Sequence, residues 1–223
     1  MTWPSEAPRE AQPAEAESYR ILRSRIDLSR LPKHSRDVTE RVIYATADFD
    51  YATDLVCDEE ALAVAVDALA AGAPVVADGA MVAAGITGGP VVCKIGEPLT
   101  ARLARTAGIS MPAAAIRLSF GEVGPGAVWV VGCAPAALTE IISRGVEPAF
   151  VIGLPAGFVG AAAAKDALRA SEIGSVSNVS EKGGAAVAAA AFNALLRSAL
   201  SVDGTRAGWG PGVTPPGDLG SVT

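Results

Sequence analysis

Histidine, cysteine and aromatic residues are scarce in this 223-residue chain, and their scarcity excludes many functions. The single histidine, His34, excludes most metal sites and every Ser-His-Asp or Cys-His arrangement that would need a second histidine. The three cysteines, Cys57, Cys93 and Cys133, form no CxxC pair. An odd number of cysteines in apolar segments indicates buried free thiols in a reducing cytoplasm. We therefore expect neither a metal site nor a disulfide framework.

Excess positive charge and long apolar runs are also missing. A net charge of -6 and a pI near 4.9 argue against nucleic acid as a partner, since phosphate binding needs clustered Lys and Arg. The first 18 residues contain no apolar core of the kind that a secretory signal needs. Gly, Pro or charged residues interrupt every apolar stretch before the roughly 18 residues of a membrane span. We expect a soluble, cytoplasmic protein.

Alanine is the residue that the chain has in excess, with 45 of 223 positions. With 50% hydrophobic and 19% charged residues, the composition is that of a globular protein long enough for a sizeable core. We expect closely packed helices and pockets lined by small side chains and backbone. Nucleotide motifs are missing, because there is no GxxxxGK[ST] and the spacing of Gly153, Gly157 and Gly160 differs from the dinucleotide fingerprint.

Short β-branched runs alternate with alanine-rich helical runs along most of the chain. We predict a disordered N-terminal arm over 1–14, one domain over 15–203 and a flexible Gly/Pro-rich tail over 204–223. Strands are predicted at 74–78, 91–95, 127–132, 149–155 and 176–180. Helices are predicted from an Asp58 cap to Gly72 and over 80–86, 98–108, 135–145, 158–170 and 183–200. This order predicts a three-layer α/β fold, a mostly parallel open sheet with helices on both faces.

Three strand-to-helix junctions are candidate sites, because ligands of open α/β sheets bind beyond the carboxyl ends of the strands. They are 132–138, 153–165 and 180–186, and Lys182 with Gly183 and Gly184 opens the last of them. Each junction can hold a carboxylate or a phosphate. The alternative is that their glycines only make tight turns.

A second candidate is the segment YATADFDY, residues 44–51, which interrupts the alanine-rich chain. It is either a capped loop with one buried aromatic or a polar-aromatic pocket wall, where a Tyr hydroxyl donates a hydrogen bond. Asp48 and Asp50 are two positions apart and would not share a helix face, so they predict no carboxylate dyad. His34 lies in the polar run PKHSRD and is interpreted as a surface residue.

The motifs RVIYATADFDYA and AGAPVVADGAMVAAGIT resemble the precorrin-8X methylmutase family of cobalamin biosynthesis. The resemblance continues through GAVWVVGCAPAAL, VIGLPAGFVGAAAAKDAL and SEKGGAAVAAAAFNALL, and it covers roughly residues 15 to 200. It implies an α/β fold with a parallel sheet, a homodimer and active sites near the subunit interface. It also implies an isomerase that moves a methyl group between adjacent ring carbons of a corrinoid precursor, formally a 1,5-sigmatropic shift, without metal or nucleotide cofactor.

The chain departs from the family at several positions that the resemblance places in the pocket. Tyr44 stands where the family typically has a His that protonates the macrocycle, and a phenol is a far weaker acid than an imidazolium. Met111 replaces an Arg, Ala80 a polar or acidic residue and Ala185 a Ser, whereas Ser18 matches a family Ser. Losing an Arg partner of a buried carboxylate costs about 2–5 kcal/mol, so binding of a polyanionic corrinoid is expected to be weak.

These considerations give a candidate site with Tyr44 as the catalytic residue and small or polar residues around the substrate. The substrate-binding residues are predicted to be Ser18, Thr46, Asp48, Ala80, Met81, Met111, Cys133, Lys182, Gly183 and Gly184.

Three functions remain open from the sequence. The first is a methylmutase in which Tyr44 acts as the hydrogen-bond donor. The second is a repurposed family member that isomerises or cyclises a smaller, less charged polyene, since a pericyclic reaction needs mainly shape, orientation and a donor. The third is a non-catalytic protein that binds a tetrapyrrole or a partner.

Overall fold

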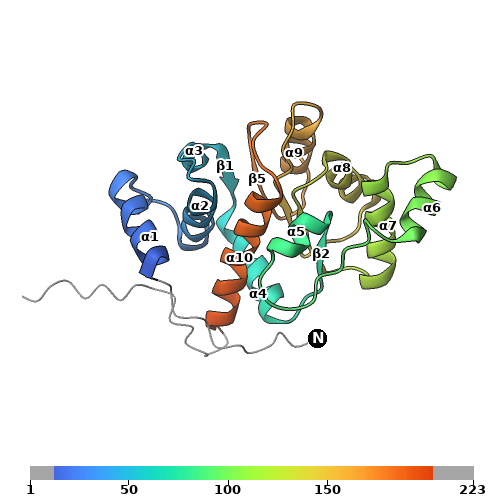
Figure 1. Cartoon of the computed structure of the whole chain (residues 1–223). Helices are drawn as coiled ribbons and strands as arrows, with labels where there is room; N and C mark the ends of the chain where they lie inside the picture. Colours follow the sequence, from blue (N-terminus) through green and yellow to red (C-terminus); the bar gives the residue numbers. More distant parts are fainter. Residues whose placement is uncertain (1–12, 203–223) are drawn as a thin grey trace, which may run out of the picture.

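Five short strands form one sheet in the order β1-β5-β4-β3-β2 (Figure 1). They are β1 (Leu55–Cys57), β2 (Val75–Ala77), β3 (Val128–Val131), β4 (Phe150–Gly153) and β5 (Ser175–Asn178). Strands β2 to β5 are parallel and follow one another in chain order, whereas β1 is antiparallel to β5. The structure is a computed structural model, and it describes residues 13–202. The predicted α/β class and the mostly parallel sheet are confirmed.

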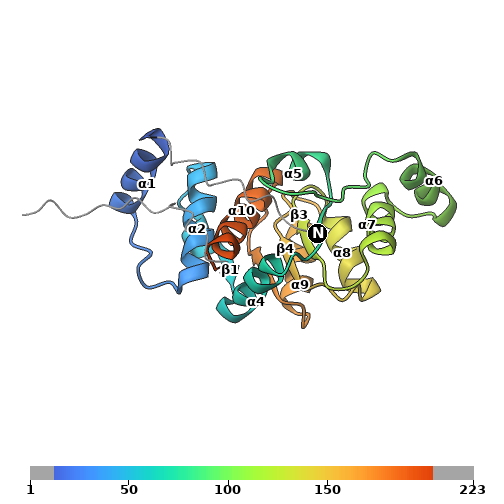
Figure 2. The ribbon, with the colours of Figure 1, turned by 90° about the horizontal axis from the view of Figure 1, so that it is seen from below.

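Helices connect the strands and cover both faces of the sheet (Figures 1 and 2). They are α1 (Pro13–Arg25), α2 (Lys33–Thr46), α3 (Tyr51–Asp54), α4 (Glu59–Ala70), α5 (Ala80–Gly85), α6 (Pro98–Ala107), α7 (Met111–Val123), α8 (Pro135–Arg144), α9 (Ala161–Arg169) and α10 (Ala185–Val202). The caps predicted for α4 are present, because the Asp58 carboxylate accepts the N–H groups of Glu60 and Ala61 at 3.0 and 3.3 Å.

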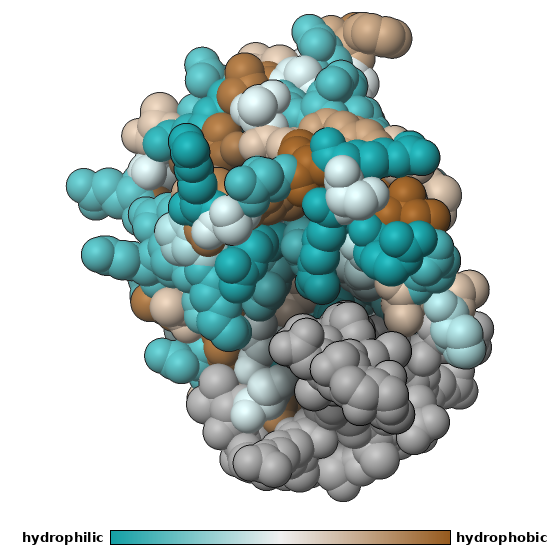
Figure 3. Space-filling view, turned by 90° about the vertical axis from the view of Figure 1, so that its left-hand side faces the viewer, coloured by the Kyte–Doolittle hydropathy of each residue, from teal (hydrophilic) through white to brown (hydrophobic). Residues whose placement is uncertain are grey.

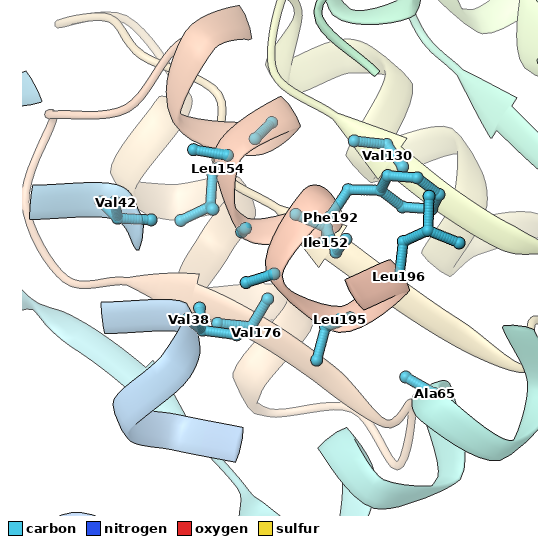
Figure 4. Packing of buried hydrophobic residues seen from close by; sticks show 14 of the residues in the cluster. Val38, Val42, Ala65, Val130, Ile152, Leu154, Val176, Phe192, Leu195 and Leu196 are labelled. Atoms are coloured by element: carbon cyan, nitrogen blue, oxygen red, sulfur yellow. The ribbon is translucent and has the colours of Figure 1, made fainter. Parts of the chain in front are cut away.

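The side chains of the strands alternate between two hydrophobic clusters, one on each face of the sheet. From β3, Val128 and Val130 enter a cluster with residues of α2, α4, α5 and α10, and Figure 4 shows Phe192 and Leu196 packed near Val130. Trp129 and Val131 enter the other cluster, with residues of α7, α8 and α9. The alternation follows from the two-residue period of a strand and makes the fold three-layered.

Small residues bring α10 unusually close to the sheet and to α5. A Cβ built on Gly132 would lie 2.8 Å from the Cβ of Ala188, and one on Gly85 would lie 2.8 Å from the Cβ of Ala189. Neither position can accept a side chain without a shift of the helix. The predicted close packing of alanine-rich helices is confirmed at this helix.

Several predicted boundaries were wrong. The segment 91–95 is not a strand, because only Val92 bridges to Val76 and Pro90 has no N–H to extend the ladder. The helix predicted from Phe158 begins at Ala161, since Gly160 has the left-handed φ of 79° and ends the loop there. The three cysteines are free, as expected, but they are half-buried rather than buried.

The sequence patterns gave no prediction for the first three helices, for β1 or for α7. Helix α1 lies at one end of the molecule, beside α2, and the face at this end is mostly polar (Figures 1 to 3). It begins at Pro13, so Pro13 and Ala14, which we assigned to the arm, form its first turn. The rest of the predicted arm and the predicted tail from 204 lie outside the described residues.

Candidate functional site

The carboxyl ends of the four parallel strands meet at one edge of the sheet, and the loops that follow them carry most of the predicted site. These loops are Asp78–Gly79 after β2, Gly132–Ala134 after β3, the segment 154–160 after β4 and the segment 179–184 after β5. Asp54, which precedes the antiparallel β1, reaches the same edge because Leu55 pairs with Asn178. The edge therefore brings together residues that are more than 100 positions apart in the chain.

The first junction, before α8, is already occupied by a carboxylate of the chain itself. Asp78 accepts the backbone N–H groups of Gly132, Cys133 and Ala134 at 3.0, 2.8 and 2.8 Å, and its side chain is buried. Burial raises the pKa of Asp78, and the three N–H donors oppose that rise. The N–H groups of Gly132, Cys133 and Ala134 are thus satisfied internally, which favours the alternative that this junction only makes a tight turn.

Cys133 lies directly beneath the start of α5. A Cβ on Gly79 would lie 2.5 Å from the Cys133 Sγ, so this glycine allows the thiol to approach the backbone. Burial, with the nearby Asp78 carboxylate, raises the pKa of Cys133 to about 11, and the thiol is thus protonated and not nucleophilic near pH 7. Ala80 and Met81 follow at the first turn of α5, both exposed, so three of the predicted substrate-binding residues form one group.

The third junction, before α10, differs because its positive side chain faces outward. The Lys182 Nζ binds Asp48 Oδ2 at 2.7 Å and Asp50 Oδ2 at 2.6 Å, which raises the pKa of Lys182. The two carboxylates converge on one cation because they lie in the turn between α2 and α3 rather than on a helix. Tyr51, the buried aromatic of the 44–51 segment, lies beneath them, with the ammonium 5.9 Å from its ring centroid.

The two glycines of this junction are required by their surroundings. Gly183 has a φ of 140°, and a Cβ there would lie 2.3 Å from the Leu154 carbonyl oxygen. The Gly184 N–H donates to that same carbonyl at 2.8 Å. The loop after β5 is thereby held against the loop after β4 at both glycines.

The N-terminal turn of α10 is open. Within residues 13–202, no acceptor takes the N–H groups of Ala185, Ala186 and Val187, and Ala186 is exposed. The first N–H groups of a helix carry a partial positive charge and bind anions. At the start of α8 only the Ala136 N–H lacks an acceptor in the same range, since Pro135 has no N–H and Ala137 donates to the Ala134 carbonyl. The α10 turn therefore has more donors for an external carboxylate.

Tyr44 lies on the last turns of α2, on the side that faces α1. Its ring stacks on that of Tyr19 with centroids 4.9 Å apart and planes 7° from parallel, and the Arg41 guanidinium lies 5.1 Å from its centroid. Arg41 in turn binds Glu15 at 2.7 Å. Among the described residues the Tyr44 hydroxyl has no hydrogen-bond partner, so it is available as a donor.

The remaining predicted residues fall in different places. The Thr46 hydroxyl, near Tyr44, donates to the Val42 carbonyl at 2.8 Å, so this side chain is bound within the last turn of α2. Ser18 is exposed on α1 and donates to the Ala14 carbonyl. Met111 begins α7, which lies at the opposite end of the molecule from α1 and α2 in both views (Figures 1 and 2). One copy of the chain therefore does not bring Met111 to Tyr44.

Polar groups beneath the α10 junction were missed from the sequence. Lys165 is buried on α9, and it binds Asn178, which binds Asp54. The spacing contained a signal, because Lys165 shares the buried face of α9 with Ala161, Ala164 and Leu168. A lysine on an apolar stripe needs internal partners.

His34 lies apart from the candidate site and, within the described part of the chain, belongs to no metal-binding group. His34 is half-buried at the N-terminal end of α2, away from Tyr44, where its backbone N–H donates to Glu59 and its Nδ1 is buried without a partner. Between residues 13 and 202 no group of His, Cys, Asp and Glu side chains is arranged to hold a metal ion. None of the helices in that range has the length and apolar character of a membrane span.

The fold defines an α/β protein whose candidate site lies at the carboxyl ends of parallel strands. A family model described as precorrin-8X methylmutase matches residues 13–198, and the chain belongs to this family. The precorrin-8X methylmutase of Sinorhizobium sp. is 36% identical over 195 residues, which cover 82% of this chain and 92% of that protein. The cobalt-precorrin-8 methylmutase of Salmonella typhimurium is 36% identical over 201 residues, which cover 84% and 95%.

Solved structures of the family have the same fold. The precorrin-8X methylmutase from Thermus thermophilus superposes with a TM-score of 0.76 at 29% identity, covering 85% of this chain and 96% of that chain. A precorrin-8X methylmutase related protein gives a TM-score of 0.72 at 29% identity, covering 80% and 98%. The named relatives are isomerases of cobalamin biosynthesis, as the resemblance in the sequence implied.

Proposed function

We propose that this chain is a methylmutase that moves a methyl group between adjacent ring carbons of a corrinoid precursor. The observation that carries the proposal is the family match over residues 13–198, which spans nearly the whole described fold and its edge site. The open turn of α10, beside Lys182, gives the carboxylate side chains of such a substrate donors to bind. The repurposed isomerase and the non-catalytic binder have no support from the comparisons, because the relatives named above are methylmutases.

Tyr44 serves as the hydrogen-bond donor to the macrocycle in this proposal. In a formal 1,5-shift the bond from the methyl group to one ring carbon breaks as the bond to its neighbour forms, and the electrons move within the ring system. The protein then needs to orient the ring and polarise it, which a fixed donor does. The stack on Tyr19 and the Arg41 guanidinium hold the Tyr44 ring, and its hydroxyl is unengaged among the described residues.

The active assembly is a cytoplasmic homodimer in this proposal. Met111 and Tyr44 lie at opposite ends of one chain, so a shared pocket needs the α7 end of one copy to meet the α2 end of another (Figures 1 and 2). The reaction needs no metal or nucleotide cofactor. Sedimentation velocity on the full 223-residue chain is expected to give a dimer. A monomer that is fully active contradicts the shared pocket.

Incubation of the purified chain with precorrin-8X tests the function. We expect hydrogenobyrinic acid as the product. Its absorption spectrum detects it, and mass spectrometry should give the same mass as the substrate, because the reaction is an isomerisation. Tyr44→Phe is expected to lower kcat by about 10²-fold or more, because a positioned proton donor typically contributes that much. Tyr19→Phe is the matched control, since it keeps the aromatic stack. Absence of product from the wild-type chain refutes the function, and a fully active Tyr44→Phe refutes the donor role alone.

A further inference from the structure

Lys165 is the only lysine or arginine between residues 13 and 202 that is buried, with 0% of the residue exposed. It projects from α9 toward the loop after β5, where its Nζ donates to Asn178 Oδ1 at 2.8 Å, to the Ser180 carbonyl at 2.5 Å and to the Lys182 carbonyl at 2.8 Å. These three acceptors use all three N–H donors of an ammonium group. All three acceptor oxygens are neutral, so the Lys165 ammonium group forms no direct ion pair with a carboxylate of the described residues.

A second layer of bonds fixes the acceptors themselves. The Asn178 amide donates to Asp54 Oδ2 at 2.8 Å. The Ser180 hydroxyl donates to Asp54 Oδ2 at 2.7 Å, and the Ser180 N–H donates to Asp54 Oδ1 at 2.8 Å. The loop after β5 is thus bound from α9 on one side and from Asp54, the last residue of α3, on the other.

We propose that Lys165 is the positioning residue of the α10 junction, and that its ammonium group holds the 178–184 loop so that the first turn of α10 faces the substrate. This inference rests on the proposed function, because it assigns the substrate's carboxylates to that junction. Lys165 is buried and its three N–H donors are all used within the protein, so it acts through the loop. Its bonds fix the carbonyls of Ser180 and Lys182, and the N–H groups that follow at the start of α10 have no acceptor between residues 13 and 202.

The ammonium form is the one that this geometry requires. A neutral amine has two N–H donors and a lone pair, so one of the three oxygens would lose its hydrogen bond and face the lone pair. Burial lowers the pKa of Lys165 to about 8, with Asp54 and Glu181 opposing the shift and Arg169 adding to it. The group is still mostly protonated at pH 7, and the loop is expected to loosen as the pH rises through 8.

The test compares Lys165→Met with Lys94→Met in the full chain. Lys94 is a matched control, because it is also held by two partners, Glu97 and Glu122, but beside α6 and α7 rather than at the edge site. Amide hydrogen exchange of residues 178–187 reports the loop directly, and KM against kcat reports the site. We expect Lys165→Met to speed exchange in this segment and to raise KM about tenfold or more, with a smaller change in kcat. Lys94→Met should change neither.

The pH profile of the wild-type chain keeps the inference testable if Lys165→Met does not fold. KM is expected to rise above pH 8 in the wild type, and this rise should be absent in Lys165→Arg, which keeps its charge. A wild-type KM that is constant from pH 7 to 9.5, or unchanged exchange in a folded Lys165→Met, overturns the inference. If the wild type shows no turnover but Lys165→Met still speeds exchange of the loop, the proposed function fails and the positioning role stands.

Discussion

The two helices α8 and α10 start at the same edge of the sheet, α8 after Gly132 and α10 after Gly183 and Gly184. The backbone N–H groups before these helices nevertheless differ in their hydrogen bonding. At α8 an acidic side chain from the loop after the neighbouring strand β2, Asp78, accepts three backbone N–H groups. At α10 a basic side chain, Lys165, accepts nothing and instead donates to carbonyls of the preceding loop. A buried carboxylate thus takes the N–H groups in the loop before α8, whereas a buried ammonium group fixes the carbonyls of the loop before α10 and takes none of its N–H groups.

The largest effect is expected at the closed junction. Asp78→Ala should lower the free energy of unfolding by about 3–5 kcal/mol, because three buried N–H groups lose a charged acceptor at once. Chemical denaturation measures the loss. Asp78→Asn, whose amide oxygen still accepts, is the milder control. Sodium formate should restore part of the stability of Asp78→Ala, relative to sodium chloride at equal ionic strength, because formate can replace the missing carboxylate. A loss below 1 kcal/mol would contradict the assigned role.

The two glycines of the open junction give the next largest effect and a matched pair. Gly183→Ala should cost about 3 kcal/mol, because its Cβ would meet the Leu154 carbonyl at 2.3 Å and its φ is 140°. Gly184→Ala should cost about 1–2 kcal/mol, because only its φ of 118° is unfavourable and its nearest neighbour lies at 3.9 Å. Thermal unfolding of both variants checks the order. Equal losses would show that the loops after β4 and β5 are not in close contact.

Lys165 should make the free energy of unfolding rise and the affinity for substrate fall as the pH increases above 8. The folded-state pKa of Lys165 is lowered from 10.5 to about 8, so between these values the unfolded chain binds the proton more strongly. The free energy of unfolding of the wild type, relative to Lys165→Met, should therefore rise from pH 8 to 10.5. KM should rise over the same range as the loop loses its third hydrogen bond. A KM that stays constant while the free energy of unfolding rises would indicate a purely structural lysine.

The smallest effect on stability is expected at the exposed ion pairs of the open junction. Lys182→Ala should leave the unfolding midpoint unchanged within error, because surface ion pairs with Asp48 and Asp50 contribute little. It should raise KM for an anionic substrate by about twofold to fivefold and reduce the dependence of KM on salt. Lys33→Ala, which removes a surface ion pair with Asp37 on α2, is the control. An unchanged KM for Lys182→Ala would show that this lysine only orders the turn.

Some features of the fold and the site were predictable because they depend on neighbours in the chain. The cap of Asp58 on α4 follows from contacts within three residues, and the alternation of strands and helices follows from local periodicity. Tyr44 and Lys182 were recognised as candidate residues from motifs. By contrast, α1 and α2 gave no prediction, because their stability depends on contacts between helices such as the Tyr19–Tyr44 stack and the Arg23–Glu40 ion pair.

The sequence by itself determined the family, the mostly parallel α/β sheet and the three loops where a site can form. The tertiary structure decided how the loops before α8 and α10 differ, because the groups that bind them come from elsewhere in the chain. Asp78 is 54 positions from Gly132, and Lys165 is 17 positions from the Lys182 carbonyl. A hydrogen bond across such a separation depends on how strands pair and helices pack, which local patterns do not specify. Both junctions lead from a parallel strand into a helix, and they differ in structure because a buried carboxylate binds one loop and a buried ammonium group binds the other.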